Sequence, residues 1–338
     1  MIFGKEQLMH AAGRAGAYYV SRRITAATPK ILMYHRFSNS EKKEYMPATV
    51  FARQIQYLTA NFNVMTMRDL ILQYNKNGRY PRDAVVITVD DGYSDFYEIA
   101  YPILKDSGAS ATFFITTRFV DGDYWLWPDK VSYVIDHVDD AESLRMPDVD
   151  IGSIKDFCAG NMTRLKSFLN KHLLSIREED KNKWITSFAE INRIIIPDSP
   201  IDEYKSVSWC NINELENNGI EIGAHTRTHV SLGRVDIQTM KNEIQGSIED
   251  IEMHTGKLPV SFCYPNGQPQ DINESAKEII RKTSCLSAVT AYYDADVTED
   301  RFEIRRFHAS SVWREFMRAA NGVHVLSARL LNRNNIMY

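Results

Sequence analysis

Short apolar runs alternate with longer amphipathic stretches along most of the chain. The runs are rich in β-branched and aromatic residues and are bounded by polar or turn-forming residues, so each predicts a strand. The stretches between them place apolar residues at helical spacing and are about as long as crossover helices. The predicted strands are 30–35, 64–67, 84–89, 109–115, 219–224, 260–264, 286–289 and 302–307, and the predicted helices include 48–60, 67–74, 236–254 and 271–282.

The runs 84–89 and 109–115 are apolar almost throughout, instead of alternating between apolar and polar positions. Strands of a parallel sheet that helices cover on both faces have this pattern. The chain therefore predicts an α/β fold with a parallel sheet or barrel.

The alternation stops between about 121 and 206, where charges cluster at 177–181 and apolar residues recur at helical spacing through 165–176. No convincing strand interrupts this segment, so we predict a helical insertion. Long additions that follow a strand of an α/β fold lie at its functional face, where they shape access for the substrate.

The first 30 residues predict another helix. It either lies on anionic lipid, as a peripheral membrane contact, or packs on the domain or on another copy of the chain. Charged residues such as Lys5, Glu6 and Arg14 interrupt its apolar stretch, whereas a signal peptide has about 7–15 uninterrupted apolar residues. We therefore expect a cytoplasmic protein, with any membrane contact at the inner face. The residues at helical spacing are Leu8, Ala11, Ala12, Ala15, Tyr18 and Tyr19, with Arg14, Arg22 and Arg23 available to face lipid.

Composition narrows the class of protein. The 338 residues are 44% hydrophobic and 25% charged, which is ordinary for a globular protein. Forty Lys and Arg against 44 Asp and Glu give a net charge of −4, so no nucleic acid is expected as a partner. The four cysteines form no CxxC pair and are too few for a disulfide framework. No run approaches the roughly 18 apolar residues that a membrane-spanning helix needs.

The run 84–89 ends in Asp90, Asp91 and Gly92. A buried strand delivers both carboxylates to its carboxyl end, where α/β folds place their sites, and the two side chains point in different directions. One carboxylate can then bind a metal while the other accepts a proton. The alternative is a turn whose aspartate caps the next helix.

His225 and His229 follow the run 219–224 at i, i+4 spacing. On one helical turn both imidazoles can reach a zinc ion, and a carboxylate from another strand end would leave one position open to water. Two separately hydrogen-bonded histidines are the alternative. A third segment, 261–267, runs from a strand into a Pro-Asn-Gly turn, whose free backbone N–H groups either meet a developing oxyanion or simply form a β-turn.

In this order and spacing, the three segments resemble the polysaccharide deacetylase family, also called the NodB homology domain or carbohydrate esterase family 4. The family's Thr-x-Asp-Asp-Gly motif stands at 88–92 and its His-(Ser/Thr)-x-x-His motif at 225–229. Segments 32–36, 101–104 and 111–115 resemble its bacterial exopolysaccharide branch. The resemblance implies an irregular (β/α)7-type barrel over 30–322 with the helical insertion at about 121–206, between an N-terminal helical extension at 1–29 and a C-terminal tail at 323–338.

The resemblance also implies roles for individual residues. Asp90 would be the general base. Asp91, His225 and His229 would hold a divalent metal, usually zinc, which activates water to attack the carbonyl carbon of an N-acetyl group. The backbone N–H of Asn266 would be the second oxyanion donor.

Two departures from the family pattern leave roles open. Many members have an arginine at the position of Cys263, where it pairs with an aspartate and orients the base. We expect Arg306, in the last predicted strand, to replace it as the partner of Asp90. A C-terminal Leu-x-His motif, whose histidine protonates the leaving amine in many relatives, is missing here. Imidazole remains the best chemical type for this acid, and the candidates are His35, His308 and His324.

Aromatic residues at 124–127 follow the fourth predicted strand. Among them, Trp125 predicts either a stacking platform for a sugar ring or an anchor for the insertion. We also expect Tyr264 and Pro265 to bind substrate. For Tyr264, as for Trp125, a role in packing is the alternative.

The sequence thus predicts a metal-dependent hydrolase that removes the N-acetyl group of an amino sugar in a glycan or surface-polysaccharide precursor and releases acetate. Its expected partner is that carbohydrate, whether polymeric, lipid-linked or nucleotide-linked. An O-acetyl esterase on a carbohydrate is the nearest alternative, because an ester leaving group needs no acid. A non-catalytic glycan-binding barrel would have lost the base or a ligand, and all four residues are present.

Overall fold

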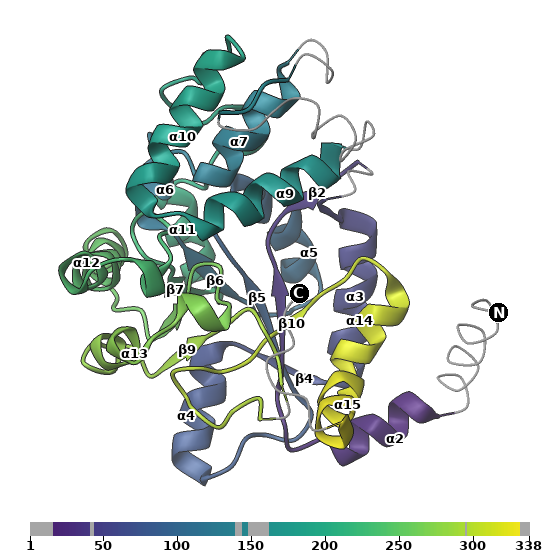
Figure 1. The fold of residues 1–338 in the computed structure, drawn as a ribbon. Coiled ribbons are helices and arrows are strands. Elements are labelled where there is room, and N and C mark those ends of the chain that lie inside the picture. Colours follow the sequence, from purple (N-terminus) through teal and green to yellow (C-terminus); the bar gives the residue numbers. More distant parts are fainter. Residues whose placement is uncertain (1–15, 41–43, 139–143, 148–161, 295, 332–338) are drawn as a thin grey trace.

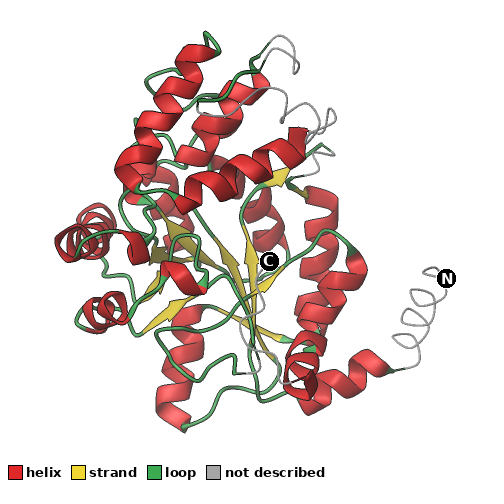
Figure 2. Cartoon of the chain, in the orientation of Figure 1, coloured by secondary structure: helices red, strands yellow, loops and turns green. Residues whose placement is uncertain are grey.

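A parallel sheet forms the centre of the computed structural model, which describes residues 16–40, 44–138, 144–147, 162–294 and 296–331. The sheet has eight strands in the order β10-β1-β5-β6-β7-β8-β9, and β4 also pairs with β5. It curls into a half-barrel surrounded by helices (Figure 1, Figure 2). Its strands are β1 (Lys30–Tyr34), β4 (Asn63–Met65), β5 (Ala84–Val89), β6 (Thr112–Ile115), β7 (Glu221–Ala224), β8 (Ser261–Cys263), β9 (Ser287–Val289) and β10 (Phe307–His308), and β2 (Phe37–Ser38) pairs separately with β3 (Met46–Pro47).

Strand β5 organises the sheet. All six of its residues are buried, as its continuous apolar sequence predicts. On one side it pairs with β1 over five residues; on the other, β4 pairs with its first half and β6 with its last two residues. The carboxyl end of β5 therefore lies between the ends of β1 and β6, which places the residues that follow it at the centre of the strand ends.

Helices cover both faces of the sheet, and local signals fix several of their ends. Thr66 and Asp236 accept backbone hydrogen bonds as N-caps of α4 and α12, and left-handed Gly78 and Gly256 end the same two helices. The helices outside the insertion are α2 (Ala17–Ile24), α3 (Ala48–Asn61), α4 (Met67–Asn77), α5 (Tyr101–Asp106), α6 (Thr117–Val120), α11 (Trp209–Asn217), α12 (Ile237–Thr255), α13 (Glu274–Arg281), α14 (Trp313–Ala320) and α15 (Val323–Leu331), with short turns η1 (Phe96–Ala100), η4 (Leu232–Arg234) and η5 (Pro269–Asp271).

The described residues of the predicted insertion form three helices, α7 (Trp127–Asp136), α9 (Met162–Ser175) and α10 (Glu178–Ile191), followed by η3 (Asp202–Tyr204). These helices enclose an apolar core of their own, which includes Val131, Leu169 and Phe188. It is separate from the core of the barrel. In Figure 1 they stand together above the sheet, at the end toward which β5 runs. The insertion is thus a second layer over the strand ends.

The predicted α/β barrel with a helical insertion is confirmed, and its sheet is curled into a half-barrel. Several predicted strands were too long, and the last differs most: β10 covers only Phe307–His308, and the segment before it forms an isolated bridge between Ile304 and Val289 of β9.

The chain ends differ from the simple extension and tail that the sequence predicts. Most of the predicted N-terminal helix lies outside the described residues, and the part within them, α2, packs against α15. Residues of the predicted tail form α15, whose Val325 and Ala328 are buried. None of the described helices has the length and apolar character needed to cross a bilayer.

Candidate active site

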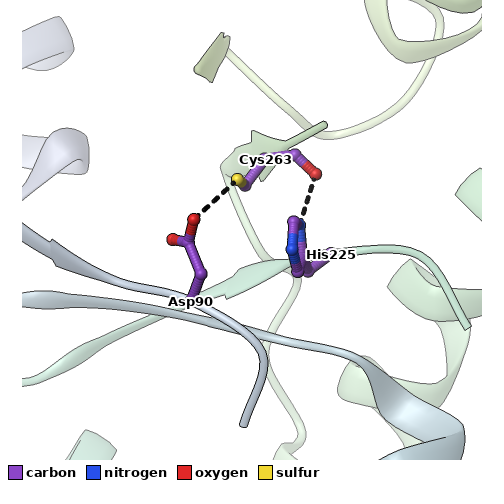
Figure 3. A group of neighbouring side chains, drawn as sticks. All are labelled: Asp90, His225 and Cys263. Atoms are coloured by element: carbon purple, nitrogen blue, oxygen red, sulfur yellow. Dashed lines mark hydrogen bonds between the residues drawn. The ribbon is translucent and has the colours of Figure 1, made fainter. Parts of the chain in front are cut away.

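The candidate site lies where neighbouring strands end. Asp90 and Asp91 directly follow β5, and His225 directly follows β7. Cys263 is the last residue of β8. Since β5, β6, β7 and β8 are parallel neighbours, their carboxyl ends meet at one edge. Figure 3 shows Asp90, His225 and Cys263 facing one another across this edge.

Three side chains form a group that fits a divalent metal. Asp91 Oδ1 lies 3.4 Å from His225 Nε2 and 3.3 Å from His229 Nε2. Ligand atoms about 2.0–2.1 Å from a tetrahedral zinc are about 3.3 Å apart, so the spacing agrees with such a centre. His225 Nδ1 lies 2.8 Å from the Cys263 carbonyl, which can only accept, so Nδ1 carries the proton and Nε2 presents its lone pair.

The expectation that both histidines lie on one helical turn is wrong. They lie in a loop, with Thr226 and His229 in the left-handed region at φ 62° and 59°. The His229 N–H donates to Thr226 Oγ1 at 3.0 Å, and Glu243 of α12 accepts from the backbone N–H groups of Arg227 and Thr228 at 2.9 Å. These bonds bring the imidazoles together, with ring centroids 4.9 Å apart.

Backbone strain concentrates at this site. Four of the seven non-glycine residues with positive φ in the described part of the chain are Asp91, Thr226, His229 and Asn266. Such conformations cost about 1–3 kcal/mol each and persist only where surrounding contacts enforce them. The adjoining strand is equally constrained: a Cβ on Gly223 would lie 2.4 Å from the Phe114 ring, so only glycine fits beside it.

Asp90 has a different environment from Asp91. Arg306 Nη1 donates to its Oδ1 at 2.7 Å and Nη2 to its Oδ2 at 2.6 Å, a bidentate ion pair between buried groups. Burial raises the pKa of Asp90, but the charge and hydrogen bonds of Arg306 outweigh burial, so this pKa lies below its ordinary value. Asp90 is therefore ionised at neutral pH and stands beside the metal group.

Cys263 is a neutral neighbour of this pair. Burial is the largest influence on its thiol and raises the pKa well above the ordinary value. Its Sγ donates to Asp90 Oδ2 at 3.5 Å, and Arg306 Nη2 lies 3.1 Å from the sulfur. The guanidinium that pairs with Asp90 thus comes from the segment before β10, where the sequence analysis expected it, and Cys263 lies beside this pair.

A sequence profile described as polysaccharide deacetylase matches residues 77–152 and 182–285, more than half of the chain. The chain belongs to the polysaccharide deacetylase family. Among curated proteins of this family, YxkH of Bacillus subtilis, whose name places it among polysaccharide deacetylases, is 27% identical over 125 residues, or 37% of this chain and 44% of YxkH. The poly-beta-1,6-N-acetyl-D-glucosamine N-deacetylase of Staphylococcus aureus is 37% identical over 90 residues, or 26% of this chain and 31% of that enzyme. The matched segments span less than half of either relative.

Two solved structures share the fold over most of the chain. The Streptococcus pyogenes deacetylase PplD, in complex with acetate, has a TM-score of 0.56 at 16% identity and covers 85% of this chain and 95% of its own. IcaB from Ammonifex degensii has a TM-score of 0.55 at 15% identity and covers 87% and 97%.

All three residues expected to bind substrate, Trp125, Tyr264 and Pro265, are buried. Trp125 is 3% exposed, packs against Tyr133 and Tyr204, and donates its N–H to the Pro197 carbonyl at 2.8 Å. This burial and these contacts match the anchoring alternative. The Tyr264 ring is also buried, and its hydroxyl donates to the Phe302 carbonyl at 2.8 Å.

The turn after β8 holds the backbone donor that the sequence analysis singled out at Asn266. Pro265 is buried, and left-handed Asn266 and Gly267 follow it at φ 58° and 57°. Among the described residues, none accepts from the backbone N–H of Asn266. This N–H thus remains available to an oxyanion.

The three candidate acids differ in their distance from the base. His35 follows β1, and its Nε2 lies 3.7 Å from Asp90 Oδ2 with its side chain 40% exposed. His308 lines a cavity together with His35. His324 contacts Tyr293 and Phe307, and burial lowers its pKa to about 4. The His35 imidazole thus lies next to the Asp90 carboxylate.

A cavity of about 570 Å³ joins the metal group to the insertion. Asp91 lines it from the barrel, and Asp129 and Lys166 line it from the insertion. Sequence analysis missed Asp129, because an acid in the first turn of a helix is an ordinary feature. It also missed Glu243, although a charge on the apolar face of predicted helix 236–254 was a usable signal. The remaining lining residues are Arg36, Glu44, Tyr45, Tyr93, Ser132, Asp136, Glu203 and Tyr204.

Proposed function

We propose that the chain is a metal-dependent deacetylase that hydrolyses the N-acetyl group of an amino sugar in a glycan. One observation carries this proposal: an ionised, arginine-paired Asp90 stands next to, but outside, a group of one aspartate and two histidines that fits a metal. A base beside a ligand set with an open position suits metal-assisted hydrolysis of an acyl bond.

Asp91, His225 and His229 would hold the metal, and zinc is the proposed ion because two imidazoles and one carboxylate form a common catalytic zinc set. When bound, such an ion supplies Lewis-acid character and lowers the pKa of a water ligand. The protein orients this set through the hydrogen bond from His225 to the Cys263 carbonyl.

Asp90 is proposed to take the proton from the attacking water. Its ion pair with Arg306 keeps the carboxylate charged and fixes both of its oxygens. The backbone N–H of Asn266 is proposed to stabilise the oxyanion that develops on the acetyl oxygen. His35, within 3.7 Å of Asp90, is the proposed donor of the proton that the leaving amine needs.

The position of His35 bears on the choice between an amide and an ester substrate. The missing Leu-x-His motif favours O-deacetylation, because an alkoxide leaves more easily than an amide nitrogen. An imidazole beside the base supplies an alternative acid and supports N-deacetylation. A binding protein without catalysis would have no need to keep the base, its partner and all three ligands together.

A polymer of N-acetylglucosamine is the proposed substrate. The Staphylococcus aureus relative is named for activity on the β-1,6-linked polymer, and the cavity beside Asp91 leaves space for sugar units next to the reacting one. A cytoplasmic location and contact of the N-terminal helix with the inner membrane face stay predictions.

Acetate release tests this function directly. The protein is stripped with a chelator, reloaded with zinc, manganese or cobalt, and assayed on β-1,6-linked and β-1,4-linked N-acetylglucosamine pentamers and on O-acetylated xylan. We expect release from an N-acetylated pentamer that disappears after chelation and returns with one of the metals. Release from O-acetylated xylan alone would replace the proposal with the esterase, and metal-independent release would contradict the metal assignment.

A further inference from the structure

Asp129 is the buried acid of the cavity beside the metal group. It lies in the first turn of α7, is 7% exposed, and lines the same cavity as Asp91. Asp136, on the same helix and in the same cavity, is neutralised by Lys166 Nζ at 2.9 Å. Within the described part of the chain, Asp129 has no cationic side chain within ion-pairing distance, so its charge is not used to hold the insertion together.

Tyr93 holds Asp129 by one oxygen. The Tyr93 hydroxyl donates to Asp129 Oδ2 at 2.8 Å. The Tyr93 ring is itself fixed, because it packs edge-on against Phe119 and the Arg36 guanidinium lies 3.7 Å from its centroid. Asp129 Oδ1 has no hydrogen-bond partner among the described residues. Tyr93 therefore fixes the Asp129 carboxyl group and leaves Oδ1 able to accept a hydrogen bond from a ligand.

Burial raises the pKa of Asp129 to about 7, although the charge of Arg36 opposes the rise. Near neutral pH the group exists both with and without its proton. In either form a hydroxyl group, which donates and accepts, can satisfy Oδ1. A sugar is the class of ligand that brings several hydroxyls into such a cavity.

We propose that Asp129 binds a ring hydroxyl of the N-acetylated sugar through Oδ1 and that Tyr93 positions it for this contact. This inference rests on the proposed function and adds to it a source of specificity. The barrel would supply the reacting groups, and the insertion would supply a contact that selects the sugar.

A structural role for Asp129 makes a different prediction. An acid in the first turn also stabilises its helix through the helix dipole. If Asp129 served only α7, its replacement would lower activity on every substrate by one common factor. A hydroxyl contact instead affects only the substrates that carry that hydroxyl.

The test uses acetate release from a β-1,6-linked N-acetylglucosamine pentamer and from its 3-deoxy and 4-deoxy analogues. With the unmodified, metal-loaded protein, we expect one analogue to lose about 10- to 100-fold in kcat/KM, the usual effect of losing a hydrogen bond to a charged group. In Asp129→Ala this discrimination should fall to about 1, because the parent pentamer loses the same contact. Asp129→Asn should keep part of it, and Tyr93→Phe should weaken it, with metal content unchanged in all three.

Asp123→Asn is the matched control, because Asp123 precedes the same helix and its side chain is 63% exposed in a surface pair with Arg118. It should discriminate between the substrates as the unmodified protein does. Equal kcat/KM of the unmodified protein on all three pentamers, or unchanged discrimination in Asp129→Ala, overturns the role of Asp129. The deoxy series needs no variant, so a variant that fails to fold does not remove the test. Absence of acetate release from both the β-1,6-linked and the β-1,4-linked N-acetylglucosamine pentamers overturns the proposed function and this inference with it.

Discussion

The strand-end site and the helical insertion are built by different physical means. At the strand ends, side chains from distant parts of the sequence are held by charged hydrogen bonds between buried groups, as in the pair of Asp90 and Arg306. The insertion is held by an apolar core of its own, and it presents polar residues such as Asp129 and Lys166 to the cavity. The difference suggests that the barrel performs the chemistry while the insertion decides what reaches it, and each half of this division can be tested separately.

His225→Ala gives the largest expected effect, because it removes a proposed metal ligand at the end of β7. Loss of a residue that only supports a ligand already costs about 10–100-fold in metal affinity, so a lost ligand should cost more than about 100-fold. Acetate release should fall to background, and metal analysis of the purified protein should show an empty site. His254→Ala is the control, since His254 is exposed and stacks on Trp209. Full metal content in His225→Ala would contradict the ligand set.

Asp90→Asn should separate catalysis from metal binding. Without the carboxylate, the attacking water has no general base, and kcat should fall by about 10²–10⁴-fold. Metal content should stay unchanged, because Asp90 is not among the proposed ligands. Asp106→Asn, a change at an exposed aspartate, is the matched control. Activity equal to that of the unmodified protein would show that another residue is the base.

Arg306→Lys should have a smaller effect on activity, because lysine keeps the charge near Asp90. It cannot reproduce the bidentate pair or the contacts of Arg306 with Thr88 Oγ1 at 3.0 Å and the Thr290 carbonyl at 2.6 Å. We expect a loss of about 10-fold in kcat and of about 1–3 kcal/mol in the free energy of unfolding, and a larger loss of about 3–5 kcal/mol in Arg306→Met, which leaves Asp90 unpaired. Chemical denaturation measures the free energy of unfolding of both variants, and acetate release measures kcat.

Arg301→Lys is the control for this pair of variants, because Arg301 is exposed and makes one hydrogen bond to Asn75. If Arg306→Met were as stable as the unmodified protein, the ion pair would have no part in holding the strand-end site together.

The strand-end site could be predicted from the sequence because its residues lie in short motifs at the ends of apolar runs. The run 84–89 predicts β5 without error, and the two aspartates after it lie where a parallel sheet places them. The pairing of Asp90 with Arg306 required more than local pattern, since 216 positions separate the two residues. The pairing was predicted only because many members of the family have an arginine where this chain has Cys263, so another arginine was expected to pair with Asp90.

The parts that could not be predicted depend on tertiary contacts. An i, i+4 histidine pair indicates a helical turn, but Glu243 of α12 binds the loop's N–H groups and replaces the helical hydrogen bonds. Trp125 has the sequence context of a binding platform, and only the packing of Tyr133 and Tyr204 around it shows that it is enclosed. The sequence marks Glu243 only as a charge on the apolar face of a predicted helix, and it carries no signal for the packing around Trp125.

Phe188→Ala tests the insertion's side of the comparison and should have the smallest effect on chemistry. Phe188 is fully buried in the insertion core and stacks on Trp184, with ring centroids 5.0 Å apart. Its truncation should cost about 3–5 kcal/mol locally. Because that core is separate from the core of the barrel, metal content should be unchanged, and KM for the pentamer should rise several-fold while kcat changes less. Ile195→Ala, at a side chain that is 89% exposed, should change neither constant. Loss of metal in Phe188→Ala would mean that the insertion also supports the strand ends, and the two regions would then be one cooperative unit.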